Sequence, residues 1–419
     1  MIANWSIVRE FNGDVKRLLG AWGLLSFGYF GILGVLFNLY LLRLGFSIEY
    51  IGILIASGQL LWAVTAIPAG AVGRRLGLRA AILAGYALNG VGISLILLVE
   101  LLPEPAWSAW IIVGWLLSWV GAAFSTVNST PYMMQSARQS QQRYAFAAQS
   151  AIIAVMAFMG GIVAGIVPGL SATMLGTTLD DPAPYRIALW IAPLIYLSAF
   201  ILMAGASSLG PAIEERKGSG SKAPLALLLL LGLVVFLQTA GVGAVRAFFN
   251  IYLDSGLNIE ISQIGLIMGG GQLLPAFVAL ATPFLIGRWG TERTLAIIGL
   301  WLGAALIILG AGATLLVAAF SFAAIVSTSA IGGTARNLFS QELVPSEWRT
   351  YSSAILIVGT ALGWAVTAGV GGYLVETVGF RIFFFLCALL ALLSTFVMLL
   401  YMRPGRDRLQ AAAHETSVD

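Results

Sequence analysis

The sequence predicts an all-α, polytopic membrane protein with 12 transmembrane helices in two pseudo-symmetric six-helix bundles. The first observation is composition: 59% of the 419 residues are hydrophobic, only 10% are charged, and the mean hydropathy is +0.94. No soluble core can absorb so much apolar surface. The second is roughly a dozen apolar windows of about 20 residues, the length that a helix needs to cross a bilayer. Strands would instead need alternating polarity.

The third observation is an internal duplication. The motif Phe37–Leu41 recurs as Phe249–Leu253, and Gly58-Gln59-Leu60-Leu61 recurs as Gly271-Gln272-Leu273-Leu274. The copies lie 212 residues apart before a short turn and 213 after it, so one inserted residue keeps both flanks in register. The stretch 135–143 likewise matches 341–349 at an offset of 206. This register indicates a duplicated half-protein.

Apolar stretches and the polar joints between them divide the chain into the following segments, given in chain order. An amphipathic cytoplasmic segment is expected at 1–17, at headgroup level, and a cytoplasmic tail at 403–419. The N-terminal bundle is 18–206 and the C-terminal bundle 224–402, joined by a polar, flexible cytoplasmic linker at 207–223 that is rich in Gly, Ser and charged residues. The predicted spans are 18–42, 48–73, 80–102, 107–134, 144–168, 186–206, 224–253, 261–287, 294–310, 312–335, 351–375 and 380–402.

Lysine and arginine positions predict the orientation. Of the 22 basic residues, only Arg43, Arg186 and Arg381 fall on one side, and Arg246 falls within a span; all others, Arg336 included, are assigned to the opposite side. Positive residues accumulate on the cytoplasmic side. We therefore expect a multi-pass protein of the cytoplasmic (inner) membrane with both termini in the cytoplasm.

Catalytic and cofactor chemistry finds no support in the sequence. The single cysteine, Cys387, lies in an apolar run, and the single histidine, His414, lies in the polar tail. A lone cysteine excludes an intramolecular disulfide and a cysteine metal cage, and no His-Glu-x-x-His or similar constellation occurs. We expect no enzyme activity, no catalytic residues, no metal and no cofactor.

The joint after the second span carries a recognisable motif, Gly70-Ala71-Val72-Gly73-Arg74-Arg75-Leu76-Gly77-Leu78-Arg79. With the six-plus-six organisation, it resembles the signature of the major facilitator superfamily of secondary transporters. Arg74 stands where that family has an aspartate and Leu78 where it has an arginine, which puts the usual inner latch in doubt. Anchoring by the positive-inside rule also explains these arginines. The gating candidates are Arg74, Arg75, Gly77, Arg79, Arg143, Arg288 and Arg349.

The fifth span departs from the Gly-Pro-x-x-Gly-Gly pattern that the family's drug-exporting proton antiporters carry. It has Gly160-Gly161, Gly165 and Val167-Pro168-Gly169 instead. This difference disfavours a proton-driven drug exporter. Glycines at such spacing favour close packing of helices over ligand binding.

The best candidate substrate contact is Arg246. Thr239, Gly243, Arg246 and Asn250 share one helix face, and Arg246 stands where the first half has Gly34. An arginine near mid-membrane costs about 3 kcal/mol on insertion scales and commonly faces a cavity or counter-ion. It would contact an anionic or strongly hydrogen-bonding substrate group; the alternatives are bonds to helix carbonyls and snorkelling to the outer surface.

Other polar and aromatic residues are weaker substrate-binding candidates. Amides at mid-span need partners, so Gln59 and Gln272 either line a cavity or bond between helices. Aromatic residues either form a cavity wall or serve packing and interfacial anchoring. The full candidate set is Arg246, Asn250, Thr239, Asn38, Tyr29, Gln59, Gln272, Trp115, Trp119 and Asn128.

Carboxylates are missing from the middle of every predicted span: Glu49, Glu100, Asp254 and Glu376 lie near outer ends and Glu342 near an inner one. Proton-coupled transport commonly uses a buried carboxylate or histidine. Facilitated diffusion, exchange, or coupling through an end-located residue is therefore favoured.

We expect a monomeric transporter that moves a small organic solute by alternating access through a central cavity between the bundles. The alternatives are translocation of an amphipathic lipid, lysolipid or drug, and a non-transporting receptor or scaffold. The basic residues follow membrane topology, so the lipid bilayer and a small-molecule or amphipathic substrate are the expected partners and nucleic acid is not.

Overall fold

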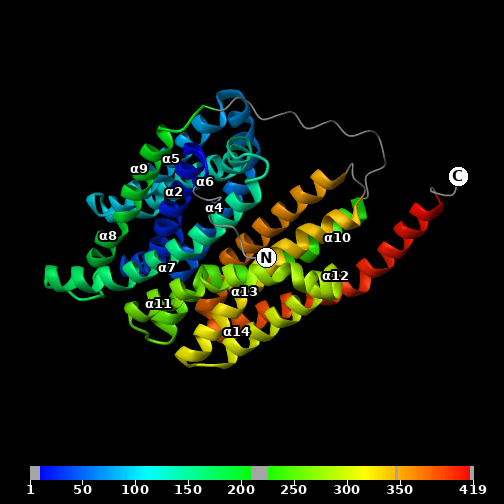
Figure 1. Cartoon of the computed structure of the whole chain (residues 1–419). Coiled ribbons are helices and arrows are strands. Elements are labelled where there is room, and N and C mark those ends of the chain that lie inside the picture. Colours follow the sequence, from blue (N-terminus) through cyan, green and yellow to red (C-terminus); the bar gives the residue numbers. More distant parts are fainter. Residues whose placement is uncertain (1–9, 209–224, 345–347, 416–419) are drawn as a thin grey trace. The chain divides into compact units, whose positions relative to one another are not determined.

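The computed structural model describes residues 10–208, 225–344 and 348–415, and almost all of them lie in helices (Figure 1). The first span is continuous over Gly13–Arg43 and consists of α2 (Gly13–Ser26), the π-helix η1 (Phe27–Leu33) and α3 (Gly34–Arg43). Asn12 caps its start, because the side chain accepts a hydrogen bond from the Val15 amide. The helices that follow are α4 (Ile48–Leu76), α5 (Leu78–Leu97), η2 (Val99–Leu101), η3 (Glu104–Ala106), α6 (Trp107–Ser136), α7 (Gln142–Leu175), α8 (Ala183–Leu189) and α9 (Ile191–Ala204).

The later part of the chain continues with α10 (Leu225–Ile251), the π-helix η4 (Tyr252–Gly256), α11 (Ile261–Gly271), α12 (Leu274–Ala311), α13 (Leu315–Leu343) and α14 (Arg349–Glu415). Two of these contain a sharp turn. Gly290 in α12 has φ 77° and Gly379 in α14 has φ 82°, a left-handed backbone that only glycine adopts readily. Each of these elements is therefore two helices joined at a glycine.

Ten described helices are long and apolar enough to cross a membrane. When α14 is divided at Gly379, and α11 is taken with the start of α12 as one interrupted span, this set is consistent with the 12 predicted spans. The all-α membrane fold predicted from the sequence is confirmed. The predicted tenth span ends at 335, whereas α13 continues to Leu343 and includes Arg336.

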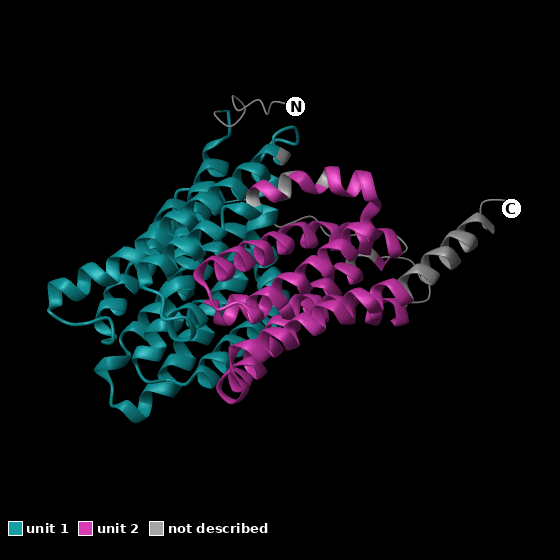
Figure 2. Ribbon diagram, turned by 90° about the horizontal axis from the view of Figure 1, so that it is seen from below, with its two compact units in different colours: residues 1–214, 250–276 teal, residues 215–249, 277–419 magenta. Residues whose placement is uncertain are grey.

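The chain forms two compact units (Figure 2). Unit 1 comprises residues 1–214 and 250–276, and unit 2 comprises 215–249 and 277–419. The sequence-predicted bundles place 250–276 in the second half, yet this stretch packs with unit 1, chiefly through α11 against α7.

Each unit has an apolar core of its own. The core of unit 1 gathers around fully buried side chains such as Leu18, Tyr86 and Tyr132. In unit 2, Val235 of α10 packs with Phe339 of α13 in a second cluster. Close-packed interiors of this kind make each unit a rigid support for the polar side chains described next.

Candidate functional site

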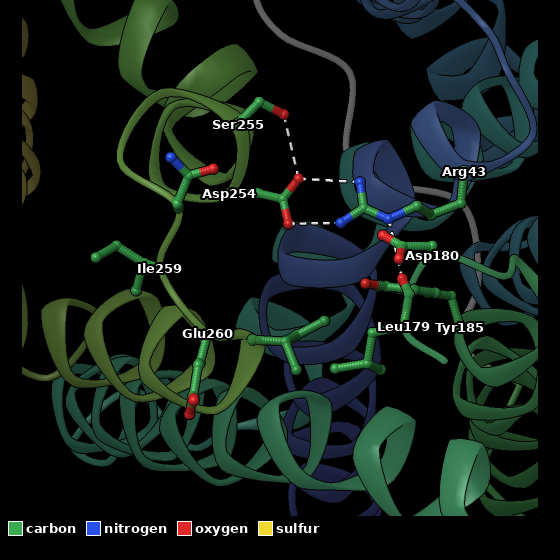
Figure 3. Close-up of a pocket in the computed structure, with 10 residues that line it drawn as sticks. Arg43, Leu179, Asp180, Tyr185, Asp254, Ser255, Ile259 and Glu260 are labelled. Carbon is green, nitrogen blue, oxygen red and sulfur yellow. Dashed lines mark hydrogen bonds and ion pairs between the residues drawn. The ribbon is translucent and has the colours of Figure 1, made fainter. Parts of the chain in front are cut away.

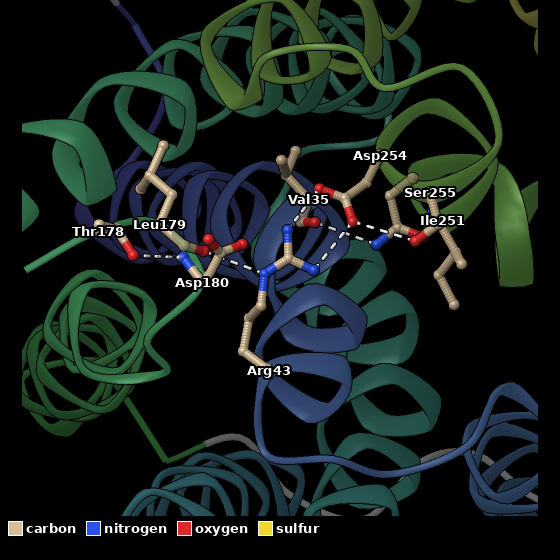
Figure 4. A network of polar contacts seen from close by, with 9 residues as sticks. Val35, Arg43, Thr178, Leu179, Asp180, Ile251, Asp254 and Ser255 are labelled. Carbon is tan, nitrogen blue, oxygen red and sulfur yellow. Dashed lines mark hydrogen bonds and ion pairs between the residues drawn. The ribbon is translucent and has the colours of Figure 1, made fainter.

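A bidentate ion pair lies at the end of unit 1 that the charge count predicts to be outer. Arg43, the last residue of α3, donates from Nη1 and Nη2 to the two carboxylate oxygens of Asp254 in η4, at 3.0 and 2.8 Å. Its Nε also donates to the Leu179 carbonyl at 3.0 Å, as Figure 4 shows. Both side chains are largely buried, 21% and 12% exposed. Charge-assisted, two-pronged bonds of this type are among the stronger polar contacts in proteins.

A pocket of about 500 Å³ adjoins this ion pair (Figure 3). Arg43 and Asp254 form part of its wall, together with Tyr185, whose ring lies 5.6 Å from the Arg43 guanidinium carbon. The wall also carries the carboxylates of Asp180 and Glu260. The ion pair thus joins α3, the α7–α8 loop and η4 beside a polar pocket.

An asparagine pair lies deeper along the same helices. Asn38 donates from Nδ2 to Oδ1 of Asn250 at 3.1 Å, and Asn250 donates from Nδ2 to the Val35 carbonyl at 3.0 Å. Both side chains are buried. Because Asn38 and Asn250 are equivalent positions of the internal repeat, the duplication brings its two copies into direct contact here.

Glycines bring α7 and α11 into backbone contact. A Cβ on Gly161 would lie 2.7 Å from the Gly269 Cα, and one on Gly265 would lie 2.4 Å from the Gly161 carbonyl oxygen. Real Cβ atoms do not approach backbone atoms so closely, so the two helices meet only because these positions lack side chains. The close packing expected of the fifth-span glycines is what the structure shows.

A second ion pair stands beside the first but connects only helices of the N-terminal half. Arg186 of α8 is ion-paired with Glu100 of η2, and the Tyr40 hydroxyl donates to Glu100 at 3.0 Å. The Arg186–Glu100 pair offers a comparison for the Arg43–Asp254 pair, because it involves no residue of 250–276.

Several predicted site residues in unit 1 bind neighbouring helices. The Trp115 Nε1 donates to the Leu54 carbonyl at 2.7 Å and its ring stacks on Phe37 at 4.5 Å. Asn128, buried, donates to the carbonyls of Ala69 and Phe124. These contacts hold α4 against α6, one of the roles that the sequence left open for them.

The other candidates in unit 1 differ in how far they are exposed. Tyr29, presented by the π-helical η1, is 36% exposed and meets the Trp119 ring edge-on at 6.4 Å. Trp119 itself is buried, and Gln59 and Gln272 are half-buried. A π-helical turn inside an α-helix often occurs at a functional position.

In unit 2, Arg246 is exposed and its guanidinium carbon lies 5.1 Å from the centroid of the Trp364 ring. The Trp364 Nε1 is buried and has no hydrogen-bond partner within the described residues. Thr239, by contrast, is buried and donates to the Val235 carbonyl of its own helix. Arg246 and Trp364 therefore place a cation beside an unused N–H donor.

The gating candidates are spread along unit 1 and unit 2. Arg74, Arg75 and Arg288 are exposed, and Arg79 donates to the Ala204 carbonyl. Gly77, with φ 96°, ends α4 in a conformation that suits glycine. The side chains of Arg143 and Arg349 lie outside the described part of the structure, as do the segments 1–9, 209–224 and 416–419 of the predicted terminal and linker regions.

Sequence reasoning passed over three residues of interest: Arg43, Asp254 and Arg336. The sequence does contain a signal for Arg43 and Asp254. In the repeat register Asp254 corresponds to Leu42, so opposite charges occupy adjacent positions of the two copies, directly after the motif that supplies Asn38 and Asn250. The charge count places Arg336 at the inner joint after the tenth span, and α13 continues through it to Leu343.

Comparison with known proteins agrees with this architecture. Residues 231–417 match the family model of the Major Facilitator Superfamily. The nucleoside transporter NupG shares the fold with a TM-score of 0.75 at 13% identity, covering 92% of this chain and 99% of that chain. The xylose transporter XylE from E. coli, in an inward open conformation, gives a TM-score of 0.73 at 13% identity, with 93% and 96% coverage.

A bacterial homologue of the human lysosomal transporter Spinster, in an inward-facing and occupied conformation, gives 0.73 at 14% identity, covering 93% of this chain and 96% of that chain. A search of curated proteins gives no significant match. The shared fold and the apolar helices define a multi-pass membrane protein. The C-terminal part of the chain therefore resembles the Major Facilitator Superfamily, and the whole chain has the fold of these solved transporters.

Proposed function

We propose that the protein moves a small organic solute across the cytoplasmic membrane by alternating access, with both termini in the cytoplasm and with the described conformation closed on the outer side. The Arg43–Asp254 ion pair is the main observation that supports this proposal. Asp254 belongs to the half that the sequence assigns to the C-terminal bundle, 224–402, while Arg43 belongs to the N-terminal bundle, 18–206. A bond between those two ends closes the outer mouth of a transporter whose halves rock about a central site.

Three further observations support an outer closure. The Asn38–Asn250 contact and the α7–α11 glycine contact involve the same stretch, 250–276. Two of the solved structures that share the fold were captured in inward-facing or inward open states. These observations support a closed outer end at the Arg43–Asp254 pair.

The substrate is proposed to carry an anionic or strongly hydrogen-bonding group. Arg246 supplies an exposed cation over the Trp364 ring, whose buried Nε1–H has no partner among the described residues. A guanidinium suits a carboxylate, phosphate or acceptor-rich hydroxylated group. The transporter is proposed to work as a monomer, without nucleic acid.

Arg246→Ala is expected to raise the KM for solute roughly tenfold or more, since a hydrogen bond to a charged group contributes about 1.5–3 kcal/mol. Trp364→Phe keeps the ring and removes the N–H, so a smaller rise is expected. A thermal-shift screen of metabolites, drugs and lipids on purified protein would supply the solute, and flux into liposomes would supply the kinetics.

Arg381→Ala is the matched control, because Arg381 also lies over an aromatic ring, that of Phe385 at 5.9 Å. It should leave the KM unchanged. Unaltered affinity and rate in Arg246→Ala would refute the assignment of Arg246. A screen that returns lysolipids and no small polar solutes would favour the amphipathic-lipid alternative, and binding without flux would favour a receptor.

A further inference from the structure

A second arginine lies within an apolar helix of unit 2. Arg336 belongs to α13, Leu315–Leu343, and stands seven residues before the end of that helix. Its Nη1 donates to Oε1 of Gln238 in α10 at 3.0 Å. Arg17, Arg43 and Arg186 each have a carboxylate partner, whereas Arg336 has none among the described residues.

One amide does not satisfy this side chain. A guanidinium carries five N–H donors, and Gln238 accepts from one of its nitrogens. The amide oxygen is neutral, so the positive charge has no carboxylate partner among the described residues. A guanidinium is matched best by a carboxylate or phosphate, whose oxygens it binds in pairs. The missing partner here is an anion.

The guanidinium of Arg336 lies beside a glycine of its own helix. Gly332 lies one turn earlier on α13, and a Cβ there would come within 3.3 Å of the Arg336 Nη1. The guanidinium therefore lies over the surface of a glycine, close to its own helix. Arg336 is half-buried as a residue, and the one side-chain acceptor that contacts its guanidinium in the described structure is Gln238.

Arg336 and Arg246 lie at two different heights along the helices of unit 2. Gln238 and Arg246 are eight residues apart on α10, which corresponds to about 12 Å along a helix axis. In the repeat, Gln238 corresponds to Ser26 and Arg336 to Thr130. Unit 2 therefore carries charge at two levels where the equivalent positions of the first half are neutral.

We propose that Arg336 and Gln238 form a second anion-binding position, which takes an oxyanion group, a carboxylate or phosphate, on the inner side of Arg246. The inference rests on the proposed function in its topology and in treating Arg246 as a substrate contact. The ligand class follows from the chemistry: a planar guanidinium binds carboxylate and phosphate oxygens in pairs. Gln238 holds the guanidinium in place and contributes amide N–H donors to the same ligand.

The test measures anion-dependent stabilisation of the purified full chain. The thermal unfolding midpoint is followed against inorganic phosphate and against sodium acetate, with sodium chloride matched for ionic strength. Wild-type protein is expected to be stabilised by phosphate or acetate beyond the chloride control, because a ligand that binds the native state raises its stability. Arg336→Met should weaken the apparent Kd roughly ten- to hundredfold.

Two further variants keep the test decisive. Arg336→Lys keeps the charge and should weaken binding less, so it serves if the methionine variant does not fold. Arg293→Gln removes an exposed arginine that belongs to no candidate site and should leave the Kd unchanged. Wild-type protein without anion-specific stabilisation, or a folded Arg336 variant that binds phosphate and acetate as wild type does, would overturn the proposal. Flux measurements are independent of this readout, so a failure of the transport assignment would be seen separately.

Discussion

Gly161→Ala should abolish transport while the protein still folds and inserts. The new Cβ would lie 2.7 Å from the Gly269 Cα and 2.9 Å from the Gly265 carbonyl oxygen, and backbone atoms cannot rotate away as a side chain can. The helices α7 and α11 must then separate at this level. Overpacking of this kind costs about 1–3 kcal/mol, which shifts a two-state equilibrium roughly five- to 150-fold away from the closed state.

Gly169→Ala is the matched control for this prediction. It is the same substitution on the same helix, and a Cβ at Gly169 meets no atom within 4 Å. Solute flux in liposomes should match wild type for this variant and fall to background for Gly161→Ala. A cysteine at Ile259, in the wall of the pocket, should react faster with an impermeant thiol reagent in the Gly161→Ala background. Equal flux and equal labelling in the two variants would show that the α7–α11 contact plays no part in the cycle.

Reversing one charge of the Arg43–Asp254 pair should reduce flux more than tenfold, because removing one partner of a buried pair costs about 3–5 kcal/mol. Arg43→Glu places two carboxylates side by side, and Asp254→Arg places two guanidinium groups side by side. The double variant Arg43→Glu with Asp254→Arg restores opposite charges and should recover part of the flux. Coupling in such a double-mutant cycle measures the pair and not the separate residues.

The Arg186–Glu100 pair supplies the comparison. Both of its residues belong to the N-terminal half, so breaking it should lower thermal stability without changing which side of the transporter is open. Arg186→Gln is therefore expected to lower the unfolding midpoint and to leave labelling of Ile259→Cys unchanged. If Arg43→Gln behaves in the same way, the Arg43–Asp254 bond is a structural contact and not a gate.

Much of the fold could be predicted from composition and repeat register alone. Apolar windows define membrane helices because no other element satisfies its backbone in lipid. The start of α4, at Ile48, and the start of α6, at Trp107, agree with the predicted span starts. The repeat singled out Asn38 and Asn250 as equivalent positions, and the structure joins them by a hydrogen bond.

The polar contacts could not be predicted in the same way. The pairing of Arg43 with Asp254 links residues 211 positions apart, and hydropathy places both simply at span ends. Which span ends lie in contact depends on the conformation that the transporter adopts. One sequence is compatible with every conformation of a transport cycle, so it does not say which contacts one structure will contain. Arg336 was passed over because a charge count records only the side of the membrane on which an arginine is expected, whereas its contact with Gln238 depends on how α10 and α13 pack.

In the proposed transport cycle, the Arg43–Asp254 end of the molecule must open and close. The most direct test of this requirement uses Arg43→Cys with Asp254→Cys in a Cys387→Ser background, since Cys387 is the only native cysteine. A short, reducible, bifunctional thiol reagent should crosslink the two positions and stop solute flux in liposomes, and reduction should restore it. Crosslinked protein that transports solute at the uncrosslinked rate would contradict the account.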